Sequence, residues 1–214
     1  MQKLLMYDCE IIKLIPTWNS VSAPYQYCTS AKDYEGMGIS VVGTWRNYDI
    51  IGYHKGRGIA LPLPLGKYEA FVNNVELIGV SLSYLPQFEY LQELLWEADL
   101  IVGFNTSKFD DHLMTANGFE VMTDYDLYWS VKVAVGEPSS YVKGITTKGH
   151  DLASFAKANG MAKTGTGALA PILWQTGYRQ QVIDYCLNDV KLLNKLYWKK
   201  QNGLLRDPKT LKLI

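Results

Sequence analysis

The chain has 214 residues, a length that suits one domain with a substantial hydrophobic core. Hydrophobic residues make up 48% of it and charged residues 20%, which excludes a disordered or fibrous protein. The 21 basic and 21 acidic side chains cancel, so no overall basic field indicates a protein that coats nucleic acid. We expect a single domain over residues 1–214.

Cysteine content and hydropathy bear on the compartment. Cys9, Cys28 and Cys186 have no metal-binding spacing and leave an odd number for disulfides. This favours reduced thiols and a cytoplasmic location. The N-terminal apolar run is interrupted by acids and lacks the cleavage pattern of a signal peptide. No stretch reaches the roughly 18 uninterrupted apolar residues of a membrane span, so we expect no membrane partner.

The first predicted element is a strand over residues 3–13, which carries two acids, Asp8 and Glu10. Side chains alternate along a strand, so both acids project from the same face. That face also carries Leu4, Met6 and Ile12, and the opposite face carries Leu5, Tyr7, Cys9 and Ile11. Apolar residues on both faces indicate a central strand that is covered on both sides.

The two strand acids need a compensating charge. Their Cα atoms would lie about 6.5–7 Å apart, and burial of a carboxylate costs several kcal/mol unless it is paired. A divalent ion such as Mg²⁺ is the simplest partner, since hard cations take carboxylate oxygens. Exposure of the strand end to solvent, or pairing with lysine and arginine side chains, is the alternative explanation.

The middle of the chain alternates between segments rich in turn-forming residues and β-branched or aromatic runs. It predicts, in order, an irregular connection over 15–35, strands over 38–45 and 48–54 joined by a turn at Arg46 and Asn47, a loop over 55–67 and a strand over 75–82. The segments 15–35 and 55–75 are longer than a minimal domain needs. We favour surface loops there over insertions that contact a substrate.

From Pro86 onward the hydrophobic period becomes that of a helix, with Phe88, Leu91 and Leu95 on one stripe. The elements expected next are a helix from 86, a strand over 100–104, a helix over 109–117, a strand and a helix between 120 and 135, and helices over 151–159 and about 177–201. Strands that alternate with helices indicate a three-layer α/β domain. Residues 163–167, KTGTG, lack the Walker order, so we expect a turn between helices there.

A second acidic site contains Asp110, the last residue of the segment GFNTSKFD at residues 103–110. The predicted strand ends at Phe104 within this segment, a short turn follows, and a predicted helix begins at its end. Ser107 and Asp110 also have the spacing of a capping box, which would require no chemistry.

The last predicted helix carries the third acidic position. Tyr185 and Asp189 are four residues apart and therefore share a face, which is otherwise apolar. An acid that faces inward requires a partner, as the strand acids do. The alternative is a partly exposed Asp189 that pairs with Lys191 or Lys195.

Three motifs now stand in order along the chain: D-x-E on the first strand, G-F-N-x-x-x-F-D between a strand and a helix, and Y-x-x-x-D on a late helix. In this order they resemble exonuclease motifs I, II and III of the DnaQ-like DEDD superfamily of 3′–5′ exonucleases. The tyrosine resembles the DEDDy branch, which includes the exonuclease domains of family B DNA polymerases. The resemblance implies a ribonuclease H-like α/β fold, with a mixed central sheet of about five strands and helices on both faces.

The resemblance also implies a catalytic site that holds two Mg²⁺ or Mn²⁺ ions. Asp8 would bridge both ions, Glu10 and Asp189 would complete the first, and Asp110 would support the second. Tyr185 would orient or help to deprotonate the attacking water. The implied reaction is phosphodiester hydrolysis that releases 5′-nucleoside monophosphates from a 3′ end.

The implied substrate is nucleic acid with a free 3′ end, with single-stranded DNA favoured over RNA, and Asn105 and Phe109 are candidate substrate contacts. We expect a stand-alone enzyme, and the near-neutral charge fits a partner protein that delivers the substrate. A ribonuclease H-like structure-specific endonuclease with the same acids is one alternative. A catalytically inactive nucleic-acid-binding module is another, although it would be expected to have lost at least one of the acids.

Overall fold

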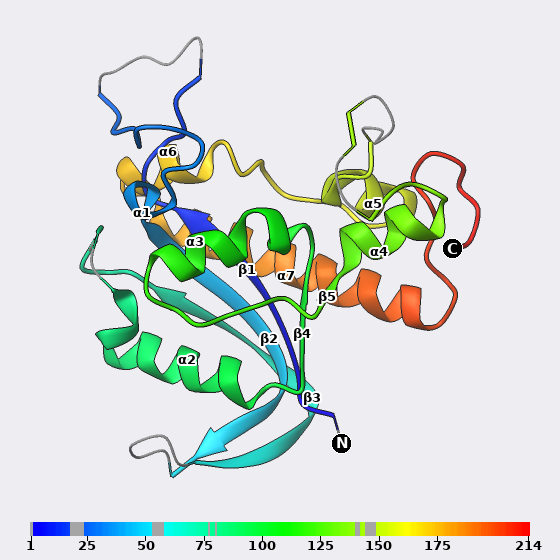
Figure 1. Ribbon diagram of the computed structural model, residues 1–214, viewed down its shortest axis with the longest axis horizontal. Coiled ribbons are helices and arrows are strands. Elements are labelled where there is room, and N and C mark those ends of the chain that lie inside the picture. Colours follow the sequence, from blue (N-terminus) through cyan, green and yellow to red (C-terminus); the bar gives the residue numbers. More distant parts are fainter. Residues whose placement is uncertain are drawn as a thin grey trace.

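The computed structural model describes residues 2–17, 24–52, 58–76, 78–79, 81–139, 142–143 and 149–214. In this part of the chain a five-stranded sheet carries helices on both faces (Figure 1). The strands are β1 (Leu4–Ile11), β2 (Ile39–Ile51), β3 (Ile59–Val72), β4 (Leu100–Gly103) and β5 (Tyr125–Asp126). Their order is β3-β2-β1-β4-β5, with β1 parallel to β4 and antiparallel to β2. The predicted ribonuclease H-like sheet is confirmed.

The helices divide between the two faces of the sheet. They are α1 (Tyr34–Met37), α2 (Pro86–Glu97), α3 (Asp110–Ala116), α4 (Leu127–Ala134), α5 (Leu152–Ala158), α6 (Ala170–Gln175) and α7 (Arg179–Gln201), with short 3₁₀ turns at Leu82–Tyr84 and Thr106–Lys108. Side chains of α2 and α3 share one core cluster with one face of β1. Side chains of α4, α5, α6 and α7 pack on the other face. The sequence did not predict the short helix α6.

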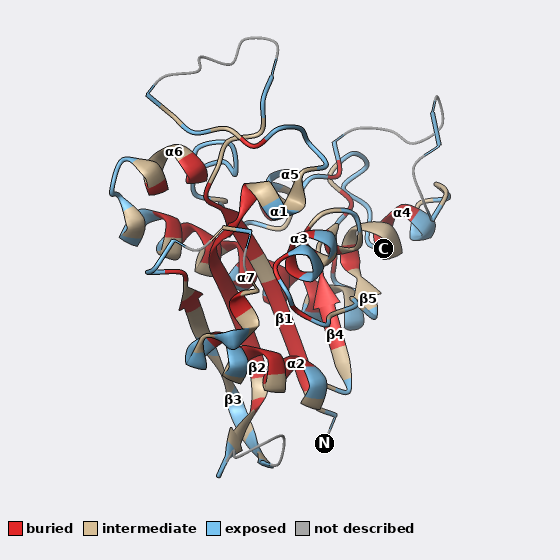
Figure 2. Ribbon diagram, turned by 60° about the vertical axis from the view of Figure 1, so that its left-hand side comes forward, coloured by how far each residue is buried: buried red, intermediate tan, exposed pale blue. Residues whose placement is uncertain are grey.

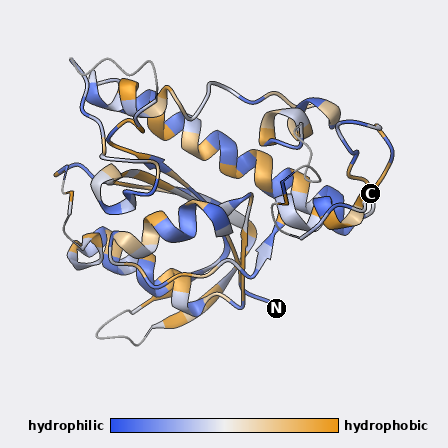
Figure 3. Cartoon of the chain, turned by 45° about the horizontal axis from the view of Figure 1, so that its top comes forward, coloured by the Kyte–Doolittle hydropathy of each residue, from blue (hydrophilic) through white to orange (hydrophobic). Residues whose placement is uncertain are grey.

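Strand β1 lies at the centre of the sheet, as its two apolar faces predict (Figure 2). Leu5 and Tyr7 point into the cluster with α2 and α3, and Leu4 and Met6 point into the cluster with α7. Helix α7 crosses the sheet on that second side, with hydrophobic and hydrophilic residues alternating along it (Figure 3). The acids of β1 therefore face α7.

The predicted hairpin at Arg46 and Asn47 is wrong. Residues Ile39–Ile51 form one strand, and the register with β3 shifts between Arg46 and Tyr48. The Asn47 side chain accepts a hydrogen bond from the Leu4 backbone N–H at 2.7 Å and donates one to the Gln2 carbonyl at 3.0 Å. The Asn47 side chain therefore makes hydrogen bonds to the chain around the start of β1 where β2 has an irregular register. The polar residues that suggested a turn belong instead to a bulge within one strand.

Two neighbouring predictions also fail. The segment 55–67 was expected to be a loop, but residues from Ile59 onward belong to β3, which pairs with β2 in antiparallel register. Pro62 and Pro64 fit there because β3 is an edge strand, where a missing N–H leaves no ladder bond unmade. The described residues of 75–82 form no strand. The predicted strand end at residues 53–54 lies outside the described residues.

Two further observations concern the chain as a whole. Cys9, Cys28 and Cys186 are all buried and free. Within the described ranges, none of the helices combines the length and the apolar character that a membrane crossing requires.

Candidate active site

Close packing of α7 on the sheet brings Asp189 of α7 near Asp8 and Glu10 of β1. Gly43 of β2 lies beside Asp8 in the sheet register. A Cβ atom on Gly43 would come within 2.9 Å of the Cys186 Sγ and 3.2 Å of Val190. The absence of a side chain at this position therefore lets α7 approach β1 and β2 closely. Cys186 also donates a hydrogen bond from its thiol to the Asp8 carbonyl at 3.4 Å.

Asp110 reaches the site from α3. Its Oδ1 atom accepts a hydrogen bond from the Cys9 backbone N–H at 3.2 Å, which ties the start of α3 to the middle of β1. The capping-box interpretation of Ser107 is wrong, because Ser107 donates from its N–H and its hydroxyl to Asp126 instead. The Asp110 carboxylate is thereby left to line the site rather than to cap the helix that it begins.

The partner of Asp189 is a lysine distant in sequence. Lys163, between α5 and α6, forms an ion pair with Asp189, and its Nζ lies 4.9 Å from the centre of the Tyr185 ring. The alternative that we considered, a partly exposed Asp189 paired with Lys191 or Lys195, is therefore wrong, because Asp189 is buried. Lys191 instead lies over the Tyr68 ring. The sequence singled out the segment around Lys163 only as a turn, because nothing local links that turn to α7.

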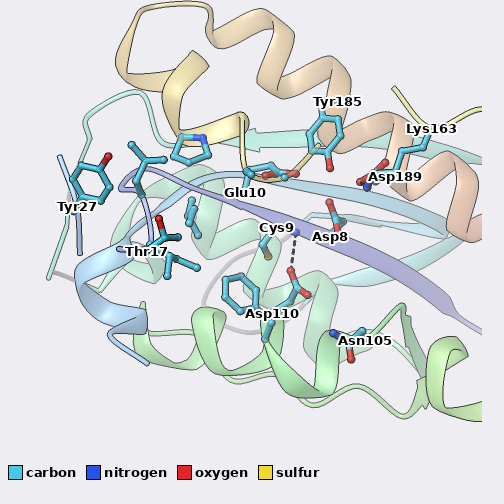
Figure 4. Close-up of a pocket in the computed structure, with 17 residues that line it drawn as sticks. Asp8, Cys9, Glu10, Thr17, Tyr27, Asn105, Asp110, Lys163, Tyr185 and Asp189 are labelled. Carbon is cyan, nitrogen blue, oxygen red and sulfur yellow. Dashed lines mark hydrogen bonds and ion pairs between the residues drawn. The ribbon is translucent and has the colours of Figure 1, made fainter. Parts of the chain in front are cut away.

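The strand and helix acids, Tyr185 and Lys163 line one cavity of about 620 Å³ (Figure 4). The structure brings together every residue proposed from the three motifs: Asp8, Glu10, Asp110, Tyr185, Asp189, Asn105 and Phe109. In Figure 4 the Tyr185 hydroxyl points toward Asp8, and Asp110 lies on the other side of β1 from Tyr185. Lys163 lines the same cavity, and it is the site residue that the motifs missed.

Part of the segment 15–35 forms the far wall of the cavity. Ile15, Thr17 and Tyr27 all line it, so the described part of this segment is more than the surface loop that we expected. Leu14 and Tyr27 form a parallel bridge. The Gln175 side chain of α6 holds this wall, because it donates to the Ile12 carbonyl at 2.9 Å and accepts from the Gln26 N–H at 2.7 Å.

The electrostatics of the cavity are dominated by acids. Burial, followed by the neighbouring carboxylates, raises the pKa of Asp8 and of Glu10 well above the ordinary range. Burial also raises the pKa of Asp110 to about 7. For Asp189, burial raises the pKa and the Lys163 ammonium opposes that rise. Burial and the same carboxylates raise the pKa of the Tyr185 phenol.

The carboxylates are undercompensated. Lys163 is the one basic side chain among the described residues that line the cavity, against four acids. The buried Oδ2 of Asp8 and Oδ1 of Asp189 accept no hydrogen bond from the described residues. Single ligand atoms of Asp8, Glu10 and Cys186 lie within 4.8 Å of one another, although the Cys186 thiol already donates to a carbonyl. Orphaned carboxylate oxygens are the donors that hard divalent cations take, so the residues fit such an ion.

Comparisons with known proteins bear on the fold. No protein-family model matches the sequence, and no curated protein does either. Among solved structures, the family B DNA polymerase of the hyperthermophilic archaeon Pyrobaculum calidifontis matches 94% of the chain at 16% identity, with a TM-score of 0.56. An exonuclease I structure matches 94% at 14% identity with a TM-score of 0.40, and a zinc-bound Escherichia coli ExoI–ssDNA complex matches 95% at 14% with 0.38.

The chain corresponds to only part of these proteins, 25% of the polymerase and 44% of either exonuclease I chain. At such identities a structural likeness concerns the fold. The polymerase match, with a TM-score of 0.56, supports the fold described above and nothing beyond the fold. The chain has a ribonuclease H-like fold, as its three motifs led us to expect.

Proposed function

We propose that this protein is a metal-dependent 3′–5′ exonuclease and that residues 1–214 form a single catalytic domain. It hydrolyses the last phosphodiester bond of a nucleic acid with a free 3′ end and releases a 5′-nucleoside monophosphate. One observation carries the proposal: four acids from β1, α3 and α7 line a single cavity together with Tyr185, and Lys163 is the one lysine beside them among the lining residues that the structure describes.

The acid cluster is the proposed site of two Mg²⁺ or Mn²⁺ ions. Asp8, Glu10, Asp110 and Asp189 would hold them. When bound, such ions polarise a phosphodiester and neutralise the negative charge that develops on its oxygens. The orphaned oxygens of Asp8 and Asp189 support this assignment, since an unpaired buried carboxylate oxygen is otherwise costly.

The protein side chains position the reactants. The Tyr185 hydroxyl, which faces Asp8, orients the attacking water by a hydrogen bond. Phe109 lines the cavity beside Asp110 and supplies an apolar surface for the sugar or base of the terminal nucleotide. Asn105 presents its amide at the same cavity. These three roles complete the set of candidate contacts between the protein and its substrate.

The test uses 5′-labelled single-stranded DNA and RNA with Mg²⁺, Mn²⁺ or a chelator, and the Asp8→Ala protein as the control. We expect a ladder that shortens from the 3′ side, requires the metal and is absent with Asp8→Ala. Internal cuts in a strand with a blocked 3′ end would instead identify an endonuclease. Binding without any cleavage would identify an inactive nucleic-acid-binding module.

A further inference from the structure

The connection over residues 163–167, between α5 and α6, packs against the Tyr185 side chain. A Cβ atom on Gly165 would lie 3.2 Å from Cδ2 and 3.5 Å from Cε2 of the tyrosine ring. A Cβ atom on Gly167 would lie 3.7 Å from the Tyr185 hydroxyl oxygen. The backbone of this connection therefore follows the tyrosine side chain from the ring to the hydroxyl.

Tyr185 also stands between two cavities. It lines the active-site cavity, and it lines a rear cavity of about 350 Å³ together with Leu173 and Val182. Gly165 lines the rear cavity, and Gly167 lines the active-site cavity. The connection thus passes from one cavity to the other beside the ring. A side chain with space on two sides keeps one orientation only where a neighbouring group holds it.

The connection is anchored at both ends. At its start, Lys163 forms an ion pair with Asp189, which lies one helical turn after Tyr185 on α7. At its end, the Ala170 N–H donates to the Gly167 carbonyl at 3.3 Å. Ala170 begins α6 and is buried in the same core cluster as Tyr185. The ring therefore rests against a segment that the fold itself holds in place.

Two separate properties favour glycine at position 165. Its φ is +74°, in the left-handed region that residues with a side chain rarely adopt. A Cβ atom at 3.2 Å from the tyrosine ring would also require the ring to move by a few tenths of an ångström. Gly160 has the first property alone, since its φ is also +74° but nothing lies within 4 Å of its Cβ position. Contact with Tyr185 therefore distinguishes Gly165 from an ordinary turn glycine.

We propose that Gly165 is a positioning residue, which keeps the Tyr185 ring out of the rear cavity and holds its hydroxyl toward Asp8 and the attacking water. This inference rests on the proposed exonuclease function. Gly165 lies outside the described lining of the active-site cavity, so it acts on hydrolysis through the ring. A change in the orientation of the hydroxyl slows the chemical step and leaves the metal ligands in place.

The experiment measures kcat and KM for release of the terminal nucleotide from a 5′-labelled oligothymidylate with Mn²⁺. Gly165→Ala should lower kcat by about 10-fold, the scale of a misplacement well below 1 Å, and leave KM unchanged. In the Tyr185→Phe background the same substitution should lower kcat no further, because the displaced hydroxyl is absent. Gly160→Ala introduces the same backbone strain without the contact, and this matched control should retain the wild-type kcat.

A second variant serves if alanine at position 165 impairs folding. The φ of Gly167 lies outside the left-handed region, so valine meets no such strain there. The methyl groups of Gly167→Val would extend from a Cβ that is already 3.7 Å from the Tyr185 hydroxyl, and they would displace it. The loss of kcat should again be confined to protein that carries the tyrosine, because Tyr185→Phe lacks the displaced oxygen.

A spectroscopic measurement reports the contact without hydrolysis. In protein labelled with 3-fluorotyrosine, the Tyr185 resonance is the one that Tyr185→Phe lacks. It should shift in Gly165→Ala and stay in place in Gly160→Ala. Equal losses of kcat with and without the tyrosine, or an unshifted resonance in Gly165→Ala, would overturn the inference and leave the exonuclease proposal intact. Failure of the wild-type protein to release a nucleotide would reject the exonuclease proposal and this inference with it.

Discussion

Two clusters of charged side chains lie on the same sheet, and their charges are neutralised in different ways. In one, the fully buried Arg46 side chain of β2 contacts Asp49 at 3.1 Å and Glu69 at 2.8 Å, and Lys67 lies 3.0 Å from Glu69. Two positive and two negative charges cancel there. In the candidate active site, four acids face the single ammonium of Lys163.

The difference separates a structural cluster from a functional one. A cluster in which positive and negative side chains are equal in number needs no added ion, and the fold alone can explain its side chains. An excess of buried carboxylates raises their pKa values and is unstable until a cation arrives. The acid cluster is therefore maintained at a cost to the fold, as expected of a site that binds ions. The substitutions that follow each change a residue of one of these two clusters.

The largest effect is expected from Asp8→Asn. The substitution keeps the shape of the side chain and removes one charge from the excess. Cation assistance contributes several kcal/mol to phosphodiester hydrolysis, so nucleotide release should fall by about 1,000-fold or more. The same change relieves repulsion, and the metal-free protein should unfold at an equal or higher urea concentration than wild type. A clear loss of stability would place Asp8 among the structural charges and contradict the comparison.

Arg46→Met should have the opposite profile. It removes the central cation of the Arg46 cluster and leaves Asp49 and Glu69 without their partner. Loss of one member of a buried ion pair costs about 3–5 kcal/mol, and we expect the lower end because both acids are a quarter or more exposed. Urea unfolding measures the loss, and the activity per folded molecule should not change. Lys67→Met, at a more exposed position, is the control and should cost under about 1 kcal/mol.

Tyr185→Phe tests the active-site cluster without a change in its charge. Loss of the hydroxyl that orients the water should slow hydrolysis by about 100-fold, at the lower end for a general acid–base group. Because the four acids remain, the rise in melting temperature on addition of Mn²⁺ should match that of wild type. Cleavage at the wild-type rate would remove Tyr185 from the mechanism, and a smaller Mn²⁺ shift would make it part of the ion site.

The sequence places three of the four acids by a local period, and it places Asp110 by its position between a predicted strand and a predicted helix. Alternation along a strand puts Asp8 and Glu10 on one face, and helical phase puts Tyr185 and Asp189 on another. The contacts that lie outside the motifs are long-range. Lys163 meets Asp189 across 26 positions, and the Asn47 side chain replaces a ladder bond to a strand 43 positions away. Neither contact leaves a periodic signal, so the lysine partner and the bulge had to be found in the structure.

The smallest and most discriminating effect is expected from Lys163→Met. The Lys163 ammonium offsets part of the acid excess, so its loss should destabilise the metal-free protein by about 1 kcal/mol. The ammonium also competes with a cation for the Asp189 carboxylate. The variant should therefore gain more stability from Mn²⁺ than wild type does, and the two melting temperatures should converge as Mn²⁺ is added.

Thermal unfolding across a Mn²⁺ titration measures both effects, with Lys157→Met on the exposed side of α5 as the matched control. Parallel titration curves for Lys163→Met and wild type would show that the lysine and the ion do not share Asp189. The ion would then have to be held by Asp8, Glu10 and Asp110 without Asp189. Convergent curves would mean that the Asp189 carboxylate exchanges the Lys163 ammonium for Mn²⁺. We expect no such exchange in the Arg46 cluster, where the charges of the side chains already cancel.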